Sequence, residues 1–316
     1  MKKAALLHLS NHMWQKKGSL SQPYKHFADF GWFDTLKCDK KTWTDITDYM
    51  AKSGFDTVVI DLGDGVIFDS HPEIAIEGAW TKAELREELS RLRSIGLTPI
   101  PKFNLSNGHS AWLHDYAYTV GTDIYDTVCC DLINEAIELF DTPEFFHLGM
   151  EEEDYGSQKG QPVAIMRCPE NKTRDCLMFC NTCRAKGVRP WIWIDDHTIE
   201  AFGGEEEFCK NFDKDLLVST WYYGSIKVND TEHPQVKFMQ KISDWGYEQI
   251  VTGSTWSWHL NMKNLMRAGK YKVQNSTVKG YMMASWMLTI PEKYYAHLDS
   301  FDNFRYAFED IYGGDE

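Results

Sequence analysis

Short apolar runs alternate with helical patterns along most of the chain. Eight of these runs predict strands, at residues 4–9, 55–60, 97–103, 145–150, 190–194, 216–220, 249–253 and 280–284. Between the runs, apolar residues recur three and four positions apart, as Leu85, Leu89 and Leu92 do, which is typical of a helix with one buried face. Gly54 and Gly96 follow two of these segments, at the position where glycine commonly ends a helix.

Strands that alternate with helices indicate a parallel sheet, and eight such units predict a closed (β/α)8 TIM barrel. We expect one barrel domain over residues 1–316, because no Pro/Ser-rich linker or low-complexity segment divides the chain. An open doubly wound sheet is the alternative. However, Gly63 and Gly65 lack the third glycine of a dinucleotide-binding loop.

Four consecutive acids, residues 151–154, follow the apolar run 145–150. A run of acids is more often a solvated loop than a site. Here it follows a predicted strand directly, and the catalytic groups of a (β/α)8 barrel lie at the carboxyl ends of its strands. His147 and Gly149 place a polar and a small residue just before the acids. The pattern therefore favours a catalytic role for Glu151 and Glu152.

Polar and aromatic residues also follow most of the other predicted strands. We expect the mouth of the barrel to gather Asn11, Asp61, Asp64, His109, Trp193, Asp195, Asp196, Trp221, Tyr222, Trp256, Trp258 and Trp286. Carboxylates surrounded by tryptophans suit a sugar, because the C–H faces of a pyranose pack on aromatic rings while its hydroxyls need polar partners. Glycoside cleavage also needs a carboxylic acid that protonates the leaving oxygen.

Composition narrows the possible partners. A net charge of −14 argues against nucleic acid and anionic membranes, and no run of 18 apolar residues predicts a membrane span. We predict neither a metal site nor a cofactor, since no His-x-His pair ends a strand. Cys176, Cys180 and Cys183 share one face of a predicted helix, which indicates core packing. The apolar stretch after Lys3 is too short for a signal peptide, so we expect a periplasmic or extracellular location if a leader was removed and a cytoplasmic one otherwise.

The segment His-Leu-Gly-Met-Glu-Glu at 147–152 resembles the His-x-Gly-Gly-Asp-Glu signature of glycoside hydrolase family 20, the β-N-acetylhexosaminidases. Other segments fit this family in order. Residues 96–101 and 107–110 resemble its third strand and Pro-Gly-His loop, residues 61–65 its acidic motif, residues 191–196 its Trp-x-Asp strand, and Trp286 its late pocket tryptophan. The resemblance covers roughly residues 55–290.

The resemblance implies substrate-assisted, retaining cleavage of a β-linked N-acetylhexosamine, or a related sugar, from the end of an oligosaccharide or glycoconjugate. Glu152 would protonate the glycosidic oxygen and Glu151 would orient the 2-acetamido group of the substrate. The carbonyl of that group attacks the anomeric carbon, so no enzyme nucleophile is needed. His109, together with Asp61 or Asp64, would tune the proton on Glu152. His147, Asn11 and the tryptophans would bind the sugar.

The chain departs from the family pattern at three places. Glu151 stands where the family has Asp, and Asn11 and His12 stand where it has a sugar-binding Arg. Its Tyr-x-Asp near the seventh strand is replaced by residues 256–259, with Tyr222 or Tyr223 as candidate substitutes. Two alternatives follow: a retaining glycosidase with Asp195 or Asp196 as nucleophile, or a catalytically inactive carbohydrate-binding barrel. We expect one of these two aspartates to face the pocket and the other to cap the next helix.

Overall fold

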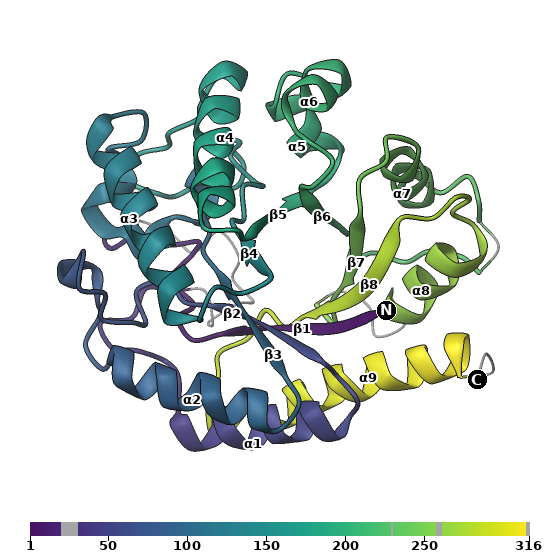
Figure 1. The fold of residues 1–316 in the computed structure, drawn as a ribbon, viewed down its shortest axis with the longest axis horizontal. Coiled ribbons are helices and arrows are strands. Elements are labelled where there is room, and N and C mark those ends of the chain that lie inside the picture. Colours follow the sequence, from purple (N-terminus) through teal and green to yellow (C-terminus); the bar gives the residue numbers. More distant parts are fainter. Residues whose placement is uncertain (20–30, 229, 257–260, 314–316) are drawn as a thin grey trace.

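A computed structural model describes residues 1–19, 31–228, 230–256 and 261–313. Its eight strands form a closed, entirely parallel barrel in sequence order, which confirms the predicted (β/α)8 fold (Figure 1). The strands are β1 Lys2–His8, β2 Thr57–Asp61, β3 Thr98–Lys102, β4 Phe145–His147, β5 Arg189–Ile194, β6 Leu217–Trp221, β7 Gln249–Gly253 and β8 Val278–Ala284.

Helices surround the barrel, with α1, α2 and α9 on one side of it and α3 to α6 on the other (Figure 1). The helices are α1 Lys40–Lys52, α2 Lys82–Ser94, α3 Asp123–Leu139, α4 Pro169–Ala185, α5 Asp196–Ala201, α6 Glu205–Asn211, α7 Pro234–Asp244, α8 Asn261–Tyr271 and α9 Tyr294–Tyr312. Local sequence sets several boundaries. Thr81 and Glu84, for example, form a reciprocal capping box at the start of α2. No helix in the described ranges is long and apolar enough to cross a membrane.

The core has two layers, because each strand is buried on both faces. In β1, Ala4 and Leu6 point into the barrel, whereas Ala5 and Leu7 pack against the surrounding helices. This explains why the strands read as continuous apolar runs rather than as alternating patterns. Cys176, Cys180 and Cys183 are fully buried on α4, as predicted for core packing.

The fourth strand is shorter than predicted. β4 ends at His147, whereas the sequence pattern indicated a strand to residue 150 that leads directly into the acids. Gly149 and Met150 have left-handed backbone angles, with φ of 76° and 75°, so the chain turns before Glu151. A Cβ atom at Gly149 would lie 2.3 Å from Asn104 Oδ1. Glycine is therefore needed here both for the backbone angle and for the close approach.

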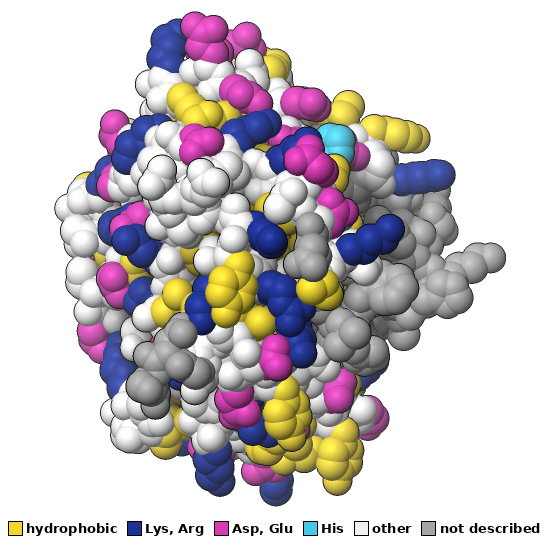
Figure 2. Space-filling view, turned by 90° about the vertical axis from the view of Figure 1, so that its right-hand side faces the viewer, with side chains coloured by type: hydrophobic (Ala, Val, Ile, Leu, Met, Phe, Trp, Pro, Cys, Tyr) yellow, Lys and Arg dark blue, Asp and Glu magenta, His cyan; other side chains and the backbone are white. Residues whose placement is uncertain are grey.

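On the face shown in Figure 2, acidic and basic side chains are interspersed, with hydrophobic side chains scattered among them. Such mixing is the usual state of a solvated protein surface and marks no binding site by itself.

Candidate active site

A cavity of about 310 Å³ opens at the carboxyl ends of the strands. The residues that line it follow or end different strands, so the barrel gathers them from distant parts of the chain. Among the described residues they are Trp14, His109, Glu151, Glu152, Ser157, Trp193, Trp221, Tyr223, Trp256 and Trp286. The volume is at the lower end of the range of about 300–1,000 Å³ found for ligand pockets.

Aromatic rings form much of the cavity wall. The ring of Trp286 lies 5.7 Å from that of Trp14 and 6.0 Å from that of Trp193, and Trp221 lies 5.1 Å from Tyr223. Neighbouring rings at these separations hold one another in place. The cavity therefore presents rigid apolar faces, of the kind on which the C–H face of a sugar packs.

One histidine bridges the two predicted catalytic acids. His109 lies in the short 3₁₀ helix η3, Asn107–His109, and its Nδ1 is 3.0 Å from Glu151 Oε1 while its Nε2 is 3.1 Å from Glu152 Oε2. The two acids differ in exposure, since the side chain of Glu151 is 6% exposed and that of Glu152 is 42% exposed. Glu152 thus faces the open part of the cavity, and Glu151 lies in its wall.

The contacts between His109 and the two acids also shift the pKa values of His109 and Glu152. Burial lowers the pKa of His109, but the carboxylates of Glu151 and Glu152 outweigh burial and raise that pKa to about 9. Burial raises the pKa of Glu152, but the cationic His109 outweighs burial and lowers that pKa below its usual value. The free site therefore holds an imidazolium beside an ionised Glu152 at neutral pH.

His147 does not line the cavity but packs against Trp193, which does. Its ring lies 4.6 Å from that of Trp193, and its Nδ1 accepts a hydrogen bond from the backbone N–H of Gly149 at 3.1 Å. Burial lowers its pKa well below the usual value, so the ring stays neutral. His147 therefore does not line the cavity, where the sequence analysis expected it to bind substrate, and its side chain contacts the exit of β4 instead.

Asp61 and Asp64 pair with residues other than His109, contrary to the sequence-based expectation. Asp61 lies inside the barrel, where it accepts a 2.6 Å hydrogen bond from Lys102 Nζ. Asp64 accepts hydrogen bonds from Ser10 and lies 2.7 Å from His12 Nδ1. Neither aspartate lines the cavity. The acidic partners of His109 in this structure are Glu151 and Glu152, which follow β4.

Asp195 and Asp196 do not line the cavity either. One oxygen of Asp195 accepts hydrogen bonds from the backbone N–H and the hydroxyl of Thr198, both at 2.7 Å, so Asp195 caps α5 as expected for one of the pair. Asp196 lies 3.3 Å from Lys241 Nζ on the surface instead of facing the pocket. This arrangement disfavours both aspartates as nucleophiles.

Three other residues predicted to bind substrate, Tyr222, Asn11 and Trp258, are not among the described residues that line the cavity. The hydroxyl of Tyr222 lies 3.4 Å from His233 Nε2, outside the cavity wall, and Asn11 is buried in the loop after β1 without lining the cavity. Trp258 lies outside the described residues. Trp193, Trp221, Trp256 and Trp286 do line the cavity, where the strand-end pattern placed them.

The sequence pattern missed Trp14 and Ser157 as cavity residues, whereas Tyr223, a candidate substitute for the family tyrosine, lines the cavity. The positions of Trp14 and Tyr223 in the sequence are consistent with this placement. Trp14 follows β1 at a distance typical of a mouth loop. Tyr223 stands two positions after Trp221, and alternate side chains of an extended segment point the same way. Ser157 belongs to an irregular loop, and no periodicity indicated its position.

Solved structures share this fold at low sequence identity. The GH20 β-N-acetylhexosaminidase of Streptomyces coelicolor A3(2) superposes with a TM-score of 0.62 at 14% identity, over 95% of this chain and 63% of that one. The chitobiase of Flavobacterium johnsoniae superposes with a TM-score of 0.65 at 14% identity, over 98% of this chain and 51% of that one. The β-N-acetylhexosaminidase of Bacteroides fragilis superposes with a TM-score of 0.60 at 11% identity, over 99% of this chain and 70% of that one.

This chain therefore spans 63% and 51% of the length of the first two of these proteins. At such identities the likeness establishes the shared barrel, as the sequence resemblance implied. No family model matches the sequence, and no curated protein matches it.

Proposed function

We propose that this chain is a glycoside hydrolase that removes a β-linked N-acetylhexosamine, or a closely related sugar, from the end of an oligosaccharide or glycoconjugate. The observation that carries the proposal is the Glu151–His109–Glu152 bridge in a cavity walled by tryptophans. The fold shared with proteins described as β-N-acetylhexosaminidases supports it. The small volume of the cavity fits an enzyme that binds one terminal sugar ring.

Glu152 is the proposed proton donor, because its side chain is 42% exposed toward the space that a sugar would fill. In the free site His109 keeps the pKa of Glu152 low. A bound sugar excludes water from Glu152, and this burial favours its protonated form. The proton then passes to the glycosidic oxygen as the bond to the anomeric carbon breaks, and Glu152 later accepts a proton from the attacking water.

Glu151 is the proposed partner of the 2-acetamido group. Its Oε1 faces His109, while Oε2 is buried without a hydrogen-bond partner among the described residues. A buried acceptor without a partner is costly, and an acetamido N–H would satisfy it. That contact would direct the acetamido carbonyl oxygen at the anomeric carbon, where a cyclic oxazolinium ion forms as the leaving group departs. Water then opens this ion with overall retention.

Tyr223 is the proposed donor to the acetamido oxygen, in place of the family tyrosine that this chain lacks. Its side chain lines the cavity together with Glu151 and Trp286. Burial raises the pKa of Tyr223 well above its usual value, so the hydroxyl keeps its proton and can donate it in a hydrogen bond.

The experiment that tests this function compares Glu152→Gln with Asp154→Asn on aryl N-acetyl-β-hexosaminides. We expect Glu152→Gln to lower kcat by about 10²–10⁴-fold, the usual contribution of a general acid. Asp154→Asn is the matched control, since Asp154 is an exposed acid of the same run and Asn can still accept the hydrogen bond from the Ser157 N–H. Full turnover by Glu152→Gln contradicts the role of Glu152. Sugar binding without any hydrolysis by the unaltered protein supports a binding barrel instead.

A thiazoline of the hexosamine tests the substrate-assisted step separately. This compound mimics the cyclic oxazolinium intermediate, so it should inhibit competitively and bind more tightly than the product sugar. Glu151→Gln should weaken that binding. Hydrolysis that the thiazoline does not inhibit, with trapping of a sugar on an enzyme carboxylate, points to a nucleophile from the protein.

A further inference from the structure

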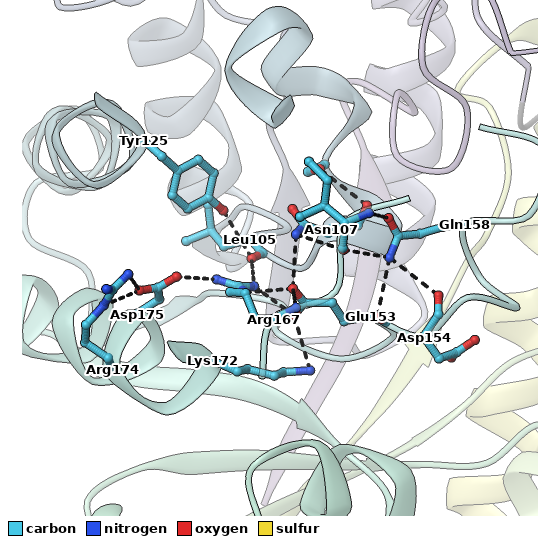
Figure 3. Close-up of polar contacts among 12 residues, drawn as sticks. Leu105, Asn107, Tyr125, Glu153, Asp154, Gln158, Arg167, Lys172, Arg174 and Asp175 are labelled. Carbon is cyan, nitrogen blue, oxygen red and sulfur yellow. Dashed lines mark hydrogen bonds and ion pairs between the residues drawn. The ribbon is translucent and has the colours of Figure 1, made fainter. Parts of the chain in front are cut away.

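A network of charged residues, most of them buried, includes Glu153, which immediately follows the acids of the site (Figure 3). Its centre is Arg167, whose side chain is 3% exposed. The guanidinium donates to Glu153 Oε1 at 2.7 Å and Oε2 at 2.9 Å, to Asp175 Oδ2 at 3.0 Å and to the backbone oxygen of Leu105 at 2.9 Å. Such a planar fork fixes four acceptors in one geometry, which a lysine cannot do.

The network joins the two loops that carry the bridge. Glu153 immediately follows Glu152, and its Oε1 also accepts a hydrogen bond from Asn107 Nδ2 at 3.1 Å. Asn107 and Leu105 belong to the loop that carries His109. The two loops also touch directly, because the Gly108 N–H donates to the backbone oxygen of Glu152 at 3.2 Å. Arg167 therefore bonds both the loop that carries His109 and the residue next to Glu152.

Helix α4 anchors the network to the barrel. Lys172, 1% exposed, donates from Nζ to the backbone oxygen of Glu151 at 2.9 Å and lies 3.5 Å from Glu153 Oε2. Asp175, fully buried on the same helix, accepts from Arg167. Two buried cations and two buried anions thus balance, and the half-exposed Arg174 also donates to Asp175 Oδ1 at 2.8 Å. Buried charges persist in this way only when they are paired and hydrogen-bonded.

We propose that Arg167 is a positioning residue that sets the spacing between His109 and the two acids of the site, an inference that rests on the proposed function. Arg167 does not line the cavity, so it acts through the loops that it ties together. A displacement of about 1 Å in a catalytic group can cost about 10²-fold in rate. Loss of the fork should therefore impair catalysis without removing any group that touches the sugar.

Two variants of the network test the proposal. Arg167→Lys keeps the charge but loses the fork. The double variant Arg167→Met/Glu153→Leu removes one cation and one anion, so the net charge of the network is unchanged, and Lys172 keeps its hydrogen bond to the backbone oxygen of Glu151. Arg184→Met is the matched control, because Arg184 makes a comparable fork with Asp215, at 2.8 and 2.7 Å, at the far end of α4. Folding of each protein is checked by circular dichroism and urea unfolding.

The first readout is the imidazole titration of His109 by NMR, assigned with His109→Gln. In the unaltered protein the carboxylates raise the pKa of His109 to about 9. We expect both network variants to lower it toward 6.5, the ordinary value, because the acids move away. Arg167→Lys keeps the positive charge and the double variant removes one cation together with one anion, so the direct charge effect on this pKa largely cancels and a clear fall reports the loss of positioning. Arg184→Met should leave it unchanged.

The second readout is hydrolysis of the aryl hexosaminide. We expect kcat to fall roughly 10- to 100-fold in both network variants, with a smaller change in KM, and to stay the same in Arg184→Met. Folded network variants that keep the titration of His109 and the kcat of the unaltered protein overturn the proposal. If the unaltered protein hydrolyses nothing, the proposed function fails, while the titration still decides the role of Arg167.

Discussion

Glu151 and Glu152 are chemically identical neighbours, and their surroundings separate their roles. One lies in the cavity wall with an oxygen that has no partner among the described residues, and the other is 42% exposed to the cavity. His109 contacts both, so a change in either acid alters the surroundings of the imidazole. Tests at the residue scale should therefore change one acid and follow the titration of His109.

The stability of the protein should depend on pH through His109. Its folded-state pKa of about 9 lies above the ordinary value of 6.5, so the folded protein binds the extra proton between these values. The stabilisation is fully present below pH 6.5 and is lost as the pH rises through 9. At about 1.4 kcal/mol per pKa unit the loss is at most about 3.5 kcal/mol, and less where water reaches Glu152.

Urea unfolding across this pH range measures the effect. His109→Gln should abolish the decline in the free energy of unfolding between pH 6.5 and 9. His71→Gln is the control, since His71 lies at 3.2 Å from Glu73 and 3.3 Å from Asp131 on the surface, where solvent screens both acids. An unchanged decline in His109→Gln contradicts the assignment.

At the scale of one element, the exit of β4 decides where the acids point. The strand stops at His147 and the chain turns through Gly149 and Met150. Even so, the backbone keeps its contact with β5, since Trp193 N donates to Gly149 O at 3.0 Å. The turn thus places Glu151 beside His109 while the segment stays hydrogen-bonded to β5.

Gly149→Ala should destabilise the protein by about 2–4 kcal/mol, which combines backbone strain with the clash against Asn104. Gly187→Ala is the matched control, because Gly187 has the same φ of 76° but nothing within 4 Å of an added Cβ. It should lose only about 1 kcal/mol. The difference between their urea midpoints isolates the close approach, and equal losses would show that Asn104 simply moves aside.

At the scale of the whole molecule, a buried ion pair lies inside the barrel. The side chains of Lys102 and Asp61 are 0% and 1% exposed, with 2.6 Å between Nζ and Oδ2. They extend from the ends of β3 and β2 into the interior layer below the cavity. Each needs the other, because an isolated charge in this layer has no access to water.

Lys102→Met should lower the free energy of unfolding by about 3–5 kcal/mol, because it leaves Asp61 without its buried partner. The double variant Lys102→Met/Asp61→Leu should recover most of that loss. Arg305→Met breaks a half-exposed surface pair with Asp302 and should cost less than about 1 kcal/mol. Urea unfolding of the three variants gives the comparison. A loss in Lys102→Met no larger than that in Arg305→Met would mean that the barrel interior is wetter than its burial indicates.

The sequence by itself determined the barrel, because the order of strands and helices depends on local periodicity and turn residues. It also indicated His109, Glu151, Glu152 and the tryptophans of the cavity wall, since residues that follow parallel strands must meet at one end of the barrel.

Only the tertiary structure decided which of these strand-end residues face the cavity. His147 and Asp61 point into deeper layers, Asp195 caps a helix, and Glu151 takes the place beside His109 that Asp61 or Asp64 was expected to fill. The physical reason is that orientation at a strand end depends on backbone turns, such as that at Gly149, and on contacts between segments far apart in the chain. The network of Arg167 likewise has no local pattern, because its partners come together only when three separate segments pack.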